Sequence, residues 1–333
     1  MIRRRQTGKV KSRNEKEGVN RHLPARICKC GKPAVIFRKY EGSYLCKSHF
    51  LESVERKVKK NMRVHNLMKP GDRIGVAVSG GKDSLSTLYL MHKILSPRRD
   101  IKLVAISIDE GIKGYRKTSI KCAEELCRKL GIRHYVYSFK KEFGKTIDQK
   151  VRELSRSKKK YDLEVSCTLC GVARRYMLNK YSRKLRLTKL CMGHNLDDEA
   201  QAVLMNYIRG DLYRDSRMGP EPVVYDRKFV GRIKPLRIIP EKEIALYALL
   251  AGIKFHSQHC PHRCGLRLEV RDFVNSLEEK HSGIKFTIIE TFDRILPSIR
   301  LQMEKEIGEL HYCKKCGEPS AREICKTCEL WRD

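Results

Sequence analysis

Long hydrophobic runs are missing from this chain of 333 residues. No stretch of about eighteen apolar residues occurs, and such a stretch is what a membrane-spanning helix requires. The amino-terminal segment MIRRRQTGKV also lacks the apolar core of a secretory signal. We therefore expect a cytoplasmic protein that has no membrane partner.

Acidic residues are scarce, because 39 Asp and Glu stand against 72 Lys and Arg, a formal net charge of +33. The positive excess is spread along the whole chain and is not confined to one tail. Charge of this size makes the protein repel itself, and it is typical of proteins that bind a polyanion. The composition favours a nucleic-acid partner over the alternative, a basic surface that is merely solvated.

The fourteen cysteines are not expected to form disulfides in a reducing compartment, so they indicate metal ligation or thiol chemistry. Cys122, Cys127 and Cys191 lie on apolar faces of an expected helix and strand, and we interpret them as small core residues. The others fall into a central set and two terminal sets.

Apolar runs alternate with longer amphipathic stretches from Arg73 onward, which predicts an α/β fold with a parallel sheet. A Lys-rich segment, Lys140 to Lys160, is expected to interrupt this pattern as a solvated helix. The predicted organisation is a disordered basic arm (1–27), a small cysteine-bearing module (28–50), a linker helix (51–70), a large α/β domain (71–303) and a second cysteine-bearing module (304–333).

A phosphate-binding loop is predicted after the apolar strand GVAVS, although the Walker pattern GxxxxGK[ST] is absent. Successive backbone N–H groups and a helix N-terminus would converge there, an arrangement that binds phosphate, whereas the simpler interpretation is a Gly-Gly turn. Asp83 would repel phosphate unless Mg²⁺ lay between them, and Lys82 supplies the opposite charge. The loop residues are Ser79, Gly80, Gly81, Lys82, Asp83 and Ser84.

Asp109 ends the next predicted strand, at the edge of a parallel sheet where ligands gather. It is a candidate for contact with adenosine or, equally, a carboxylate that caps a loop. A second acidic group, Asp197, Asp198 and Glu199, opens a later helix. These side chains could stabilise the helix dipole, or they could hold Mg²⁺ or polarise a substrate.

Cys167 and Cys170 are expected to precede a basic helix that carries Arg174 and Arg175, and both features favour thiolates. Two sulfurs do not complete a structural zinc site, which needs four ligands. A third ligand is expected from the segment HCPHRC, which contains Cys260 and Cys264.

Three thiolates on a [4Fe–4S] cluster would leave one iron open to an exogenous sulfide. Two alternatives remain open. Cys167 and Cys260 could form and resolve a persulfide without iron, or the four cysteines of this central set could hold structural zinc.

The terminal cysteine sets are predicted to bind two Zn²⁺ ions. The C-terminal pattern is C-x2-C-x8-C-x2-C, which offers four sulfurs at zinc spacing. At the other end a tighter C-x-C pair is followed by C-x2-H. The expected ligands are Cys28, Cys30, Cys46 and His49 for one ion, and Cys313, Cys316, Cys325 and Cys328 for the other.

The motifs SGGKDS, CxxC before a basic helix, GHNLDDEAQ and HCP, with a zinc module at each end, resemble the tRNA 2-thiolation family that includes TtuA, NcsA and, more distantly, TtcA. The resemblance covers about residues 28–330. It implies a PP-loop fold, which is Rossmann-like and of the adenine nucleotide alpha hydrolase type. ATP would adenylate the C2 oxygen of a tRNA uridine, sulfur would replace that oxygen, and AMP and pyrophosphate would be released.

By the same resemblance, Cys167, Cys170 and Cys260 would hold the cluster, although Cys264 lies outside the usual triad. Asp198 and Lys82 would be catalytic, and Ala77, Arg174 and Gly193 would join the loop in binding ATP. The sulfur donor would be sulfide or a ubiquitin-like carrier with a C-terminal thiocarboxylate. The family also implies a homodimer and leaves two target positions, the wobble uridine, favoured by HCPHRCGLRLEVRDF, and the T-loop.

Two other functions fit part of the pattern. A lysidine-type tRNA ligase shares the loop but does not need the three cysteines. A zinc-bearing RNA-binding protein with a relict nucleotide fold would bind RNA without releasing pyrophosphate.

Overall fold

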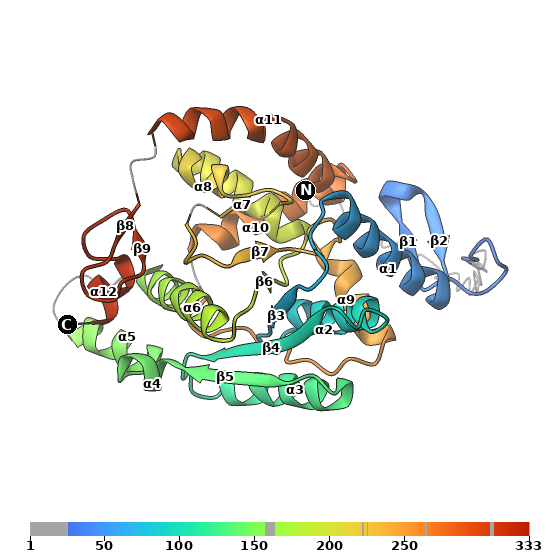
Figure 1. Ribbon diagram of the computed structural model, residues 1–333. Helices are drawn as coiled ribbons and strands as arrows, with labels where there is room; N and C mark the ends of the chain where they lie inside the picture. The colour runs from blue at the N-terminus through green and yellow to red at the C-terminus, as the bar shows by residue number, and fades with distance from the viewer. Residues whose placement is uncertain are drawn as a thin grey trace, which may run out of the picture.

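The computed structural model describes residues 26–156, 164–221, 223–224, 226–263, 265–306 and 310–332. The predicted basic arm lies almost entirely outside these residues, as do the end of the Lys-rich segment, 157–160, and Cys264. The described part forms a central α/β layer structure with a small cysteine-bearing module at each end (Figure 1).

Five parallel strands make the central sheet in the order β5–β4–β3–β6–β7. The strands run over Arg73–Ala77 (β3), Lys102–Asp109 (β4), His134–Ser138 (β5), Lys189–Cys191 (β6) and Gly231–Ile233 (β7). The register pairs Ile74 with Leu103 on one side and with Lys189 on the other. The predicted parallel sheet is confirmed, with β7 as an edge strand that the sequence pattern did not indicate.

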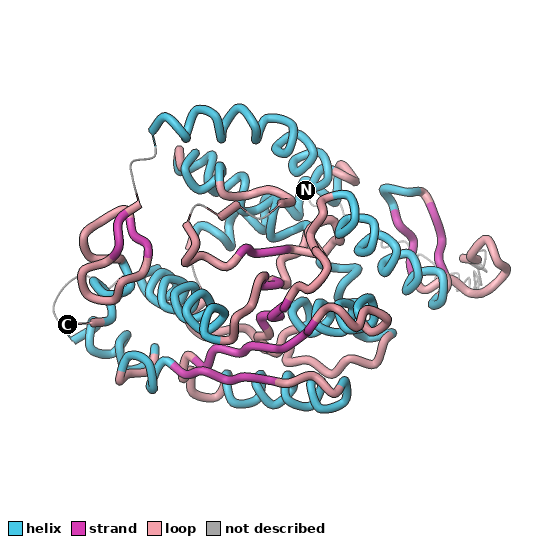
Figure 2. The backbone as a smooth tube through the Cα atoms, in the orientation of Figure 1, coloured by secondary structure: helices cyan, strands magenta, loops and turns pink. Residues whose placement is uncertain are grey.

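Both faces of the sheet are covered by helices (Figure 2), which explains why its strands are apolar almost throughout. Adjacent residues of one strand enter different cores: Ala105 belongs to one hydrophobic cluster and Ile106 to the other. The first core is built from Lys47–Val64 (α1), Lys82–Leu95 (α2), Arg116–Leu130 (α3) and Glu241–Leu250 (α9). The second is built from Phe139–Phe143 (α4), Ile147–Arg156 (α5), Glu164–Lys184 (α6) and Lys326–Trp331 (α12).

The cysteines interpreted as core residues lie in the first core, where Cys127 and Cys191 are buried and Cys122 is partly buried against it. A third, smaller core joins Leu196–Arg209 (α7) to Ile284–Glu306 (α11). Leu212–Ser216 (α8) and Leu266–Lys280 (α10) pack beside them.

The amino-terminal module pairs Ile36–Arg38 (β1) with Ser43–Leu45 (β2), joined by a short turn at Lys39–Glu41. Its Arg38 is buried, and its guanidinium nitrogens donate to the carboxylate of Glu243 on α9 at 2.7 to 3.1 Å. The predicted linker helix is α1, which begins within the module itself, at Lys47. The module is therefore attached to the core by a buried ion pair as well as by a helix.

The carboxyl-terminal module pairs His311–Tyr312 (β8) with Pro319–Ser320 (β9) and ends in α12. Trp331 is buried against α6, and its indole N–H donates to the carbonyl of Leu169 at 3.2 Å. The two terminal modules lie at opposite ends of the molecule in Figure 1.

Candidate functional site

The glycine-rich loop joins β3 to α2 at the carboxyl edge of the sheet. Gly81 is the N-cap of α2, and no side chain caps the helix, so its first N–H groups remain available. Within the loop the backbone N–H of Ser79 donates to Ser84 Oγ at 3.0 Å, and that hydroxyl donates to the carbonyl of Gly81 at 3.0 Å. These bonds hold the loop as a rounded turn around the helix N-terminus.

Two glycines are required by close backbone contacts. Gly80 has φ +87°, and a Cβ there would lie 1.9 Å from the carbonyl oxygen of Ser119. A Cβ on Gly193 would lie 2.9 Å from the Cα of Ser84. The loop is therefore fitted between α3 and the strand end that carries Gly193, and neither position has room for a side chain.

Lys82 lies between two carboxylates, with Nζ 2.8 Å from Asp83 and 2.8 Å from Glu241. The other oxygen of Asp83 accepts from the side-chain amide of Asn195 at 3.0 Å. Burial raises the pKa of Asp83, and Lys82 opposes that effect. The side chains of the loop are thus tied to the GHNLDDE turn and to α9.

A polar network, buried at Arg116 and Glu110, runs from the loop to Arg174 beside the cysteines. Arg116 donates to the carbonyl of Ser79 at 2.7 Å and lies 2.7 Å from the carboxylate of Glu110. The other oxygen of Glu110 lies 3.7 Å from Arg174. No sequence motif indicated Arg116 or Glu110, although Glu110 follows the predicted strand-end residue Asp109.

Asp109 itself accepts a hydrogen bond from the backbone N–H of Gly111 at 2.9 Å, and Ala77 ends β3 beside Ile106. The carboxylate of Asp109 thus caps the loop, which is one of the two roles that the sequence left open for it. Both residues lie at the carboxyl edge of the sheet, where the contact with ATP was predicted.

Cys167 and Cys170 do not precede the basic helix but lie inside it, in the first two turns of α6. Cys167 is exposed, and its Sγ lies 3.0 Å from the carbonyl of His262. Burial raises the pKa of Cys170 to about 12, an effect that Arg174 opposes. The expectation that both sulfurs are intrinsically thiolates is therefore wrong for Cys170, because burial outweighs the nearby guanidinium.

Cys260 comes from a segment much later in the sequence and lies near Cys167 and Cys170. It is half-buried and packs against the same core as Cys170, and burial raises the pKa of its thiol as well. The backbone N–H of His256, four residues before it, donates to the carbonyl of Gly80 at 2.9 Å. The segment that carries Cys260 is therefore anchored on the phosphate loop.

The three acidic residues of the GHNLDDE turn have different surroundings. Asp197 is buried, in contact with Lys285, and accepts from the backbone N–H of Glu241 at 2.7 Å. Glu199 is buried beside Lys234 and Arg237. These two carboxylates hold the fold together and are not exposed to a ligand.

Asp198 differs from its neighbours because its carboxylate reaches a cleft. It forms a capping box with Asn195, and its Oδ1 lies 2.7 Å from Arg267 on α10. Burial raises the pKa of Asp198, against the opposing charge of Arg267. Capping therefore accounts for part of this motif, but it leaves Asp198 accessible.

One cleft of about 1300 Å³ contains both Cys167 and Asp198 in its lining, together with Glu241. Three carboxylates line it, including Asp211, so cations outnumber anions severalfold. Its basic lining residues are Arg175, Arg209, Arg214, Arg217, Arg232, Arg263, Arg267, Arg271, Arg322 and Lys326. A cleft of this charge is suited to a polyanion and brings it to a thiol and a carboxylate.

Both terminal cysteine sets are gathered as predicted. The ligand atoms of Cys28, Cys30, Cys46 and His49 lie within 4.8 Å of one another, and so do those of Cys313, Cys316, Cys325 and Cys328. Tetrahedral zinc with bonds of about 2.3 Å would separate its sulfurs by roughly 3.8 Å. The sulfurs of Cys30 and Cys46 are 3.7 Å apart, and those of Cys316 and Cys325 are 3.6 Å apart, so both sets fit zinc.

The parallel sheet, the glycine-rich loop at its carboxyl edge and the adjoining polar turn define a PP-loop domain, and the model of that family matches residues 50–260. Residues 28–51 match the N-terminal LIM domain of the 2-thiouridine synthetase TtuA. The chain belongs to the PP-loop family of tRNA 2-thiolation proteins, as its relatives show.

The tRNA 2-thiolation protein NcsA of Haloferax volcanii is 36% identical over 318 residues, which cover 91% of this chain and 97% of that protein. The tRNA-5-methyluridine(54) 2-sulfurtransferase of Pyrococcus horikoshii is 33% identical over 311 residues, covering 91% and 93%. The structure of the U34-tRNA thiolase NcsA from Methanococcus maripaludis with its [4Fe–4S] cluster superposes with a TM-score of 0.77, at 36% identity, covering 92% and 96%. The family resemblance and the fold class predicted from the sequence are confirmed.

Proposed function

We propose that this protein is an ATP-dependent tRNA uridine 2-sulfurtransferase. The observation that carries the proposal is a basic cleft that exposes Cys167 and Asp198 beside the phosphate loop. The relatives reported above, named as tRNA thiolation proteins, support the same conclusion.

The phosphate loop would bind the triphosphate through backbone N–H groups at the start of α2. Lys82 contacts the carboxylates of Asp83 and Glu241 and could turn from them towards the phosphate oxygens. Asp83 could contact the same oxygens through Mg²⁺. The substrate uridine would enter the cleft with its C2 oxygen directed at the α-phosphorus. That oxygen attacks, pyrophosphate leaves, and the ring becomes an activated adenylate.

Asp198 would act on the uridine ring. With its pKa raised by burial, it can accept a proton or hydrogen bond from the base while the C2 oxygen attacks. The sulfur nucleophile then attacks C2, and AMP leaves with the original oxygen. Arg267, which contacts Asp198, lies where it can neutralise the phosphate charge of AMP.

Cys167, Cys170 and Cys260 would hold a [4Fe–4S] cluster. Their fit rests on a donor set of three thiols, two of them at the edge of an apolar core, with Arg174 as a compensating charge. When bound, such a cluster supplies an iron position open to sulfide. In the iron-free alternative, a donor that itself carries a persulfide would pass its outer sulfur to Cys167, and Cys260 would resolve the resulting persulfide.

The remaining parts of the proposal concern location and partners. We propose that both terminal cysteine sets bind Zn²⁺ and stabilise their modules. The sulfur donor would be sulfide or a thiocarboxylate carrier. The wobble uridine would be the target, and the enzyme would be a homodimer. A cytoplasmic location fits the cysteines of the described residues, which are free thiols. None of the helices in the described ranges combines the length and the apolar character needed to traverse a bilayer.

Anaerobic reconstitution tests the activity. Protein with iron and sulfide, ATP and unmodified tRNA should release pyrophosphate and yield 2-thiouridine by nucleoside mass spectrometry. Cys170→Ala should abolish thiolation, whereas a lysidine-type ligase would be unaffected. Full activity of an iron-free preparation would exclude the cluster, and RNA binding without pyrophosphate release would exclude the enzyme.

A further inference from the structure

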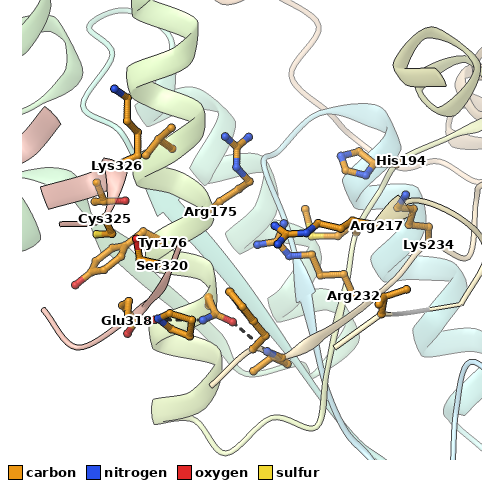
Figure 3. Close-up of a pocket in the computed structure, with 18 of the residues that line it drawn as sticks. Arg175, Tyr176, His194, Arg217, Arg232, Lys234, Glu318, Ser320, Cys325 and Lys326 are labelled. Atoms are coloured by element: carbon orange, nitrogen blue, oxygen red, sulfur yellow. Dashed lines mark hydrogen bonds between the residues drawn. The ribbon is translucent and has the colours of Figure 1, made fainter. Parts of the chain in front are cut away.

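A second cavity of about 570 Å³ adjoins the cleft, between α6, the β7 strand and the carboxyl-terminal module (Figure 3). Its size suits one nucleotide or a similar small ligand. Lining residues shared with the cleft make the two spaces continuous: Val172, Arg175, Arg217, Arg232, Ser320 and Lys326.

Arg175, Arg217 and Arg232 line this cavity from three separate elements (Figure 3). Within the described residues, no hydrogen bond or ion pair joins Arg175 or Arg232 to a carboxylate. Burial, together with Arg175 and Arg174, lowers the pKa of Arg232 to about 10, so it remains charged at neutral pH. Arg232, which is partly buried, is thus repelled by Arg175, which is exposed on the neighbouring helix.

The other cations and anions of the cavity are already engaged. Lys234 lies 2.8 Å from both oxygens of Glu199, and Glu318 pairs with Arg183. The remaining carboxylate, Glu221, is exposed. Among the described residues of the cavity wall, the partly buried Arg232 therefore has no carboxylate partner, and the exposed Arg175 has none either.

The rest of the cavity is largely apolar. Val172, Met192, Val223 and Val230 contribute aliphatic surface, and Phe229 is only half-buried there. Phe229 is thus an aromatic lining residue of the kind on which a base can stack. Guanidinium groups beside an apolar, aromatic wall match a phosphate joined to a base.

We propose that this cavity binds one nucleotide of the tRNA that flanks the modified uridine, with its phosphate on Arg175, Arg217 and Arg232. This inference rests on the proposed function and extends it to a second position of the RNA. A strand that enters the cleft passes these arginines, which line both spaces, and anchoring a neighbour fixes the position of the reacting base.

The carboxyl-terminal module forms one wall of the cavity through Glu318, Ser320, Cys325 and Lys326. Its proposed zinc would thereby support RNA binding, in addition to the fold of the module. The amino-terminal module lies at the opposite end of the molecule, and none of its described residues lines this cavity.

The test compares Arg232→Gln and Arg175→Gln with Arg128→Gln, which removes the same charge from an exposed position on α3. The reconstituted enzyme receives inorganic sulfide as its sulfur source, so no carrier protein is needed. Both cavity variants should bind unmodified tRNA on the order of tenfold more weakly, while the control changes little. The slope of log affinity against log salt should fall by about 0.7 to 0.9 for each phosphate that the variant no longer neutralises.

Phosphate ethylation interference locates the interaction. In the wild-type protein, ethylating one phosphate near the target uridine should block binding, and that signal should disappear in Arg232→Gln but persist in Arg128→Gln. Unchanged ATP affinity and unchanged Trp331 fluorescence would show that each variant is folded.

Equal tRNA affinity and equal interference patterns in all three variants would overturn the inference. A defect seen only when a thiocarboxylate protein replaces sulfide would also overturn it, because the cavity would then be a carrier site. If the wild-type protein forms no 2-thiouridine, but its interference signal is lost in Arg232→Gln, the nucleotide site is supported and the proposed activity is rejected.

Discussion

Gly80 shows how a single residue decides the geometry of the phosphate loop. Its positive φ and the carbonyl of Ser119 leave no space for a methyl group. The sequence identified Gly80 as part of a turn, but the neighbour that makes it indispensable comes from α3. The same is true of Gly193, whose contact with Ser84 joins two motifs distant in sequence.

Gly80→Ala should lower ATP affinity at least tenfold and destabilise the fold by about 1–3 kcal/mol, because the loop must move away from Ser119. Isothermal titration with ATP and urea unfolding would measure both effects. Gly114→Ala is the matched control, since Gly114 has φ +75° but no atom within 4 Å of the added Cβ. Similar losses in both variants would attribute the effect to φ alone.

Asp215 provides a pH prediction. Burial raises its pKa to about 6, with Asn206 donating to one oxygen. The native state therefore holds its proton more tightly than the unfolded state, so stability falls as the pH rises from about 4 to 6 and stays reduced above that. Asp215→Asn should flatten this dependence and raise stability at pH 7 by about 1–3 kcal/mol.

Urea midpoints of the whole chain between pH 4.5 and 8 check this prediction. Asp272→Asn, an exposed position on α10, removes the same charge as a control. An Asp215→Asn variant with the wild-type pH dependence would contradict the assignment of the titration to Asp215.

At the scale of elements, helices carry most of the site. The sequence predicted α2 and its loop correctly, because a strand, two glycines and an apolar helix occur consecutively. It misplaced the start of α6, since the segment before Cys167 carries no pattern that sets a helix boundary. The pKa of Cys170 followed from that packing and not from its position in the sequence.

The contact between the amino-terminal module and α9 depends on Arg38 and Glu243, which are both buried. Glu243→Gln removes the buried charge partner of Arg38 and leaves only the partly exposed Glu41, at 3.1 Å, so the free energy of unfolding should fall by roughly 3 kcal/mol. Thermal unfolding would measure the loss, and limited proteolysis should show faster cleavage of residues 26–46. Glu329→Gln, which removes an exposed ion pair with Lys326, should cost less than about 1 kcal/mol.

At the scale of the whole molecule, the two terminal modules, each proposed to bind zinc, can be distinguished by the single tryptophan of the chain, Trp331. It lies in α12, which begins directly after Cys325 and includes Cys328. Cys316→Ser or removal of zinc should release α12 from α6, shifting Trp331 emission to longer wavelength. Cys28→Ser should leave the emission unchanged, and a shift of equal size there would mean that the modules are coupled.

The sequence alone determined the class of the fold, the phosphate loop, the two terminal ligand sets and the basic character of the surface. These features are local, because neighbouring residues carry strand and helix periodicity, turn glycines and ligand spacing. The tertiary structure decided which carboxylate of three faces the cleft, how Glu110 and Arg116 link the loop to Arg174, and which cavity Arg175 and Arg232 line together. Those outcomes depend on burial and on partners far apart in the chain, and no short pattern encodes them.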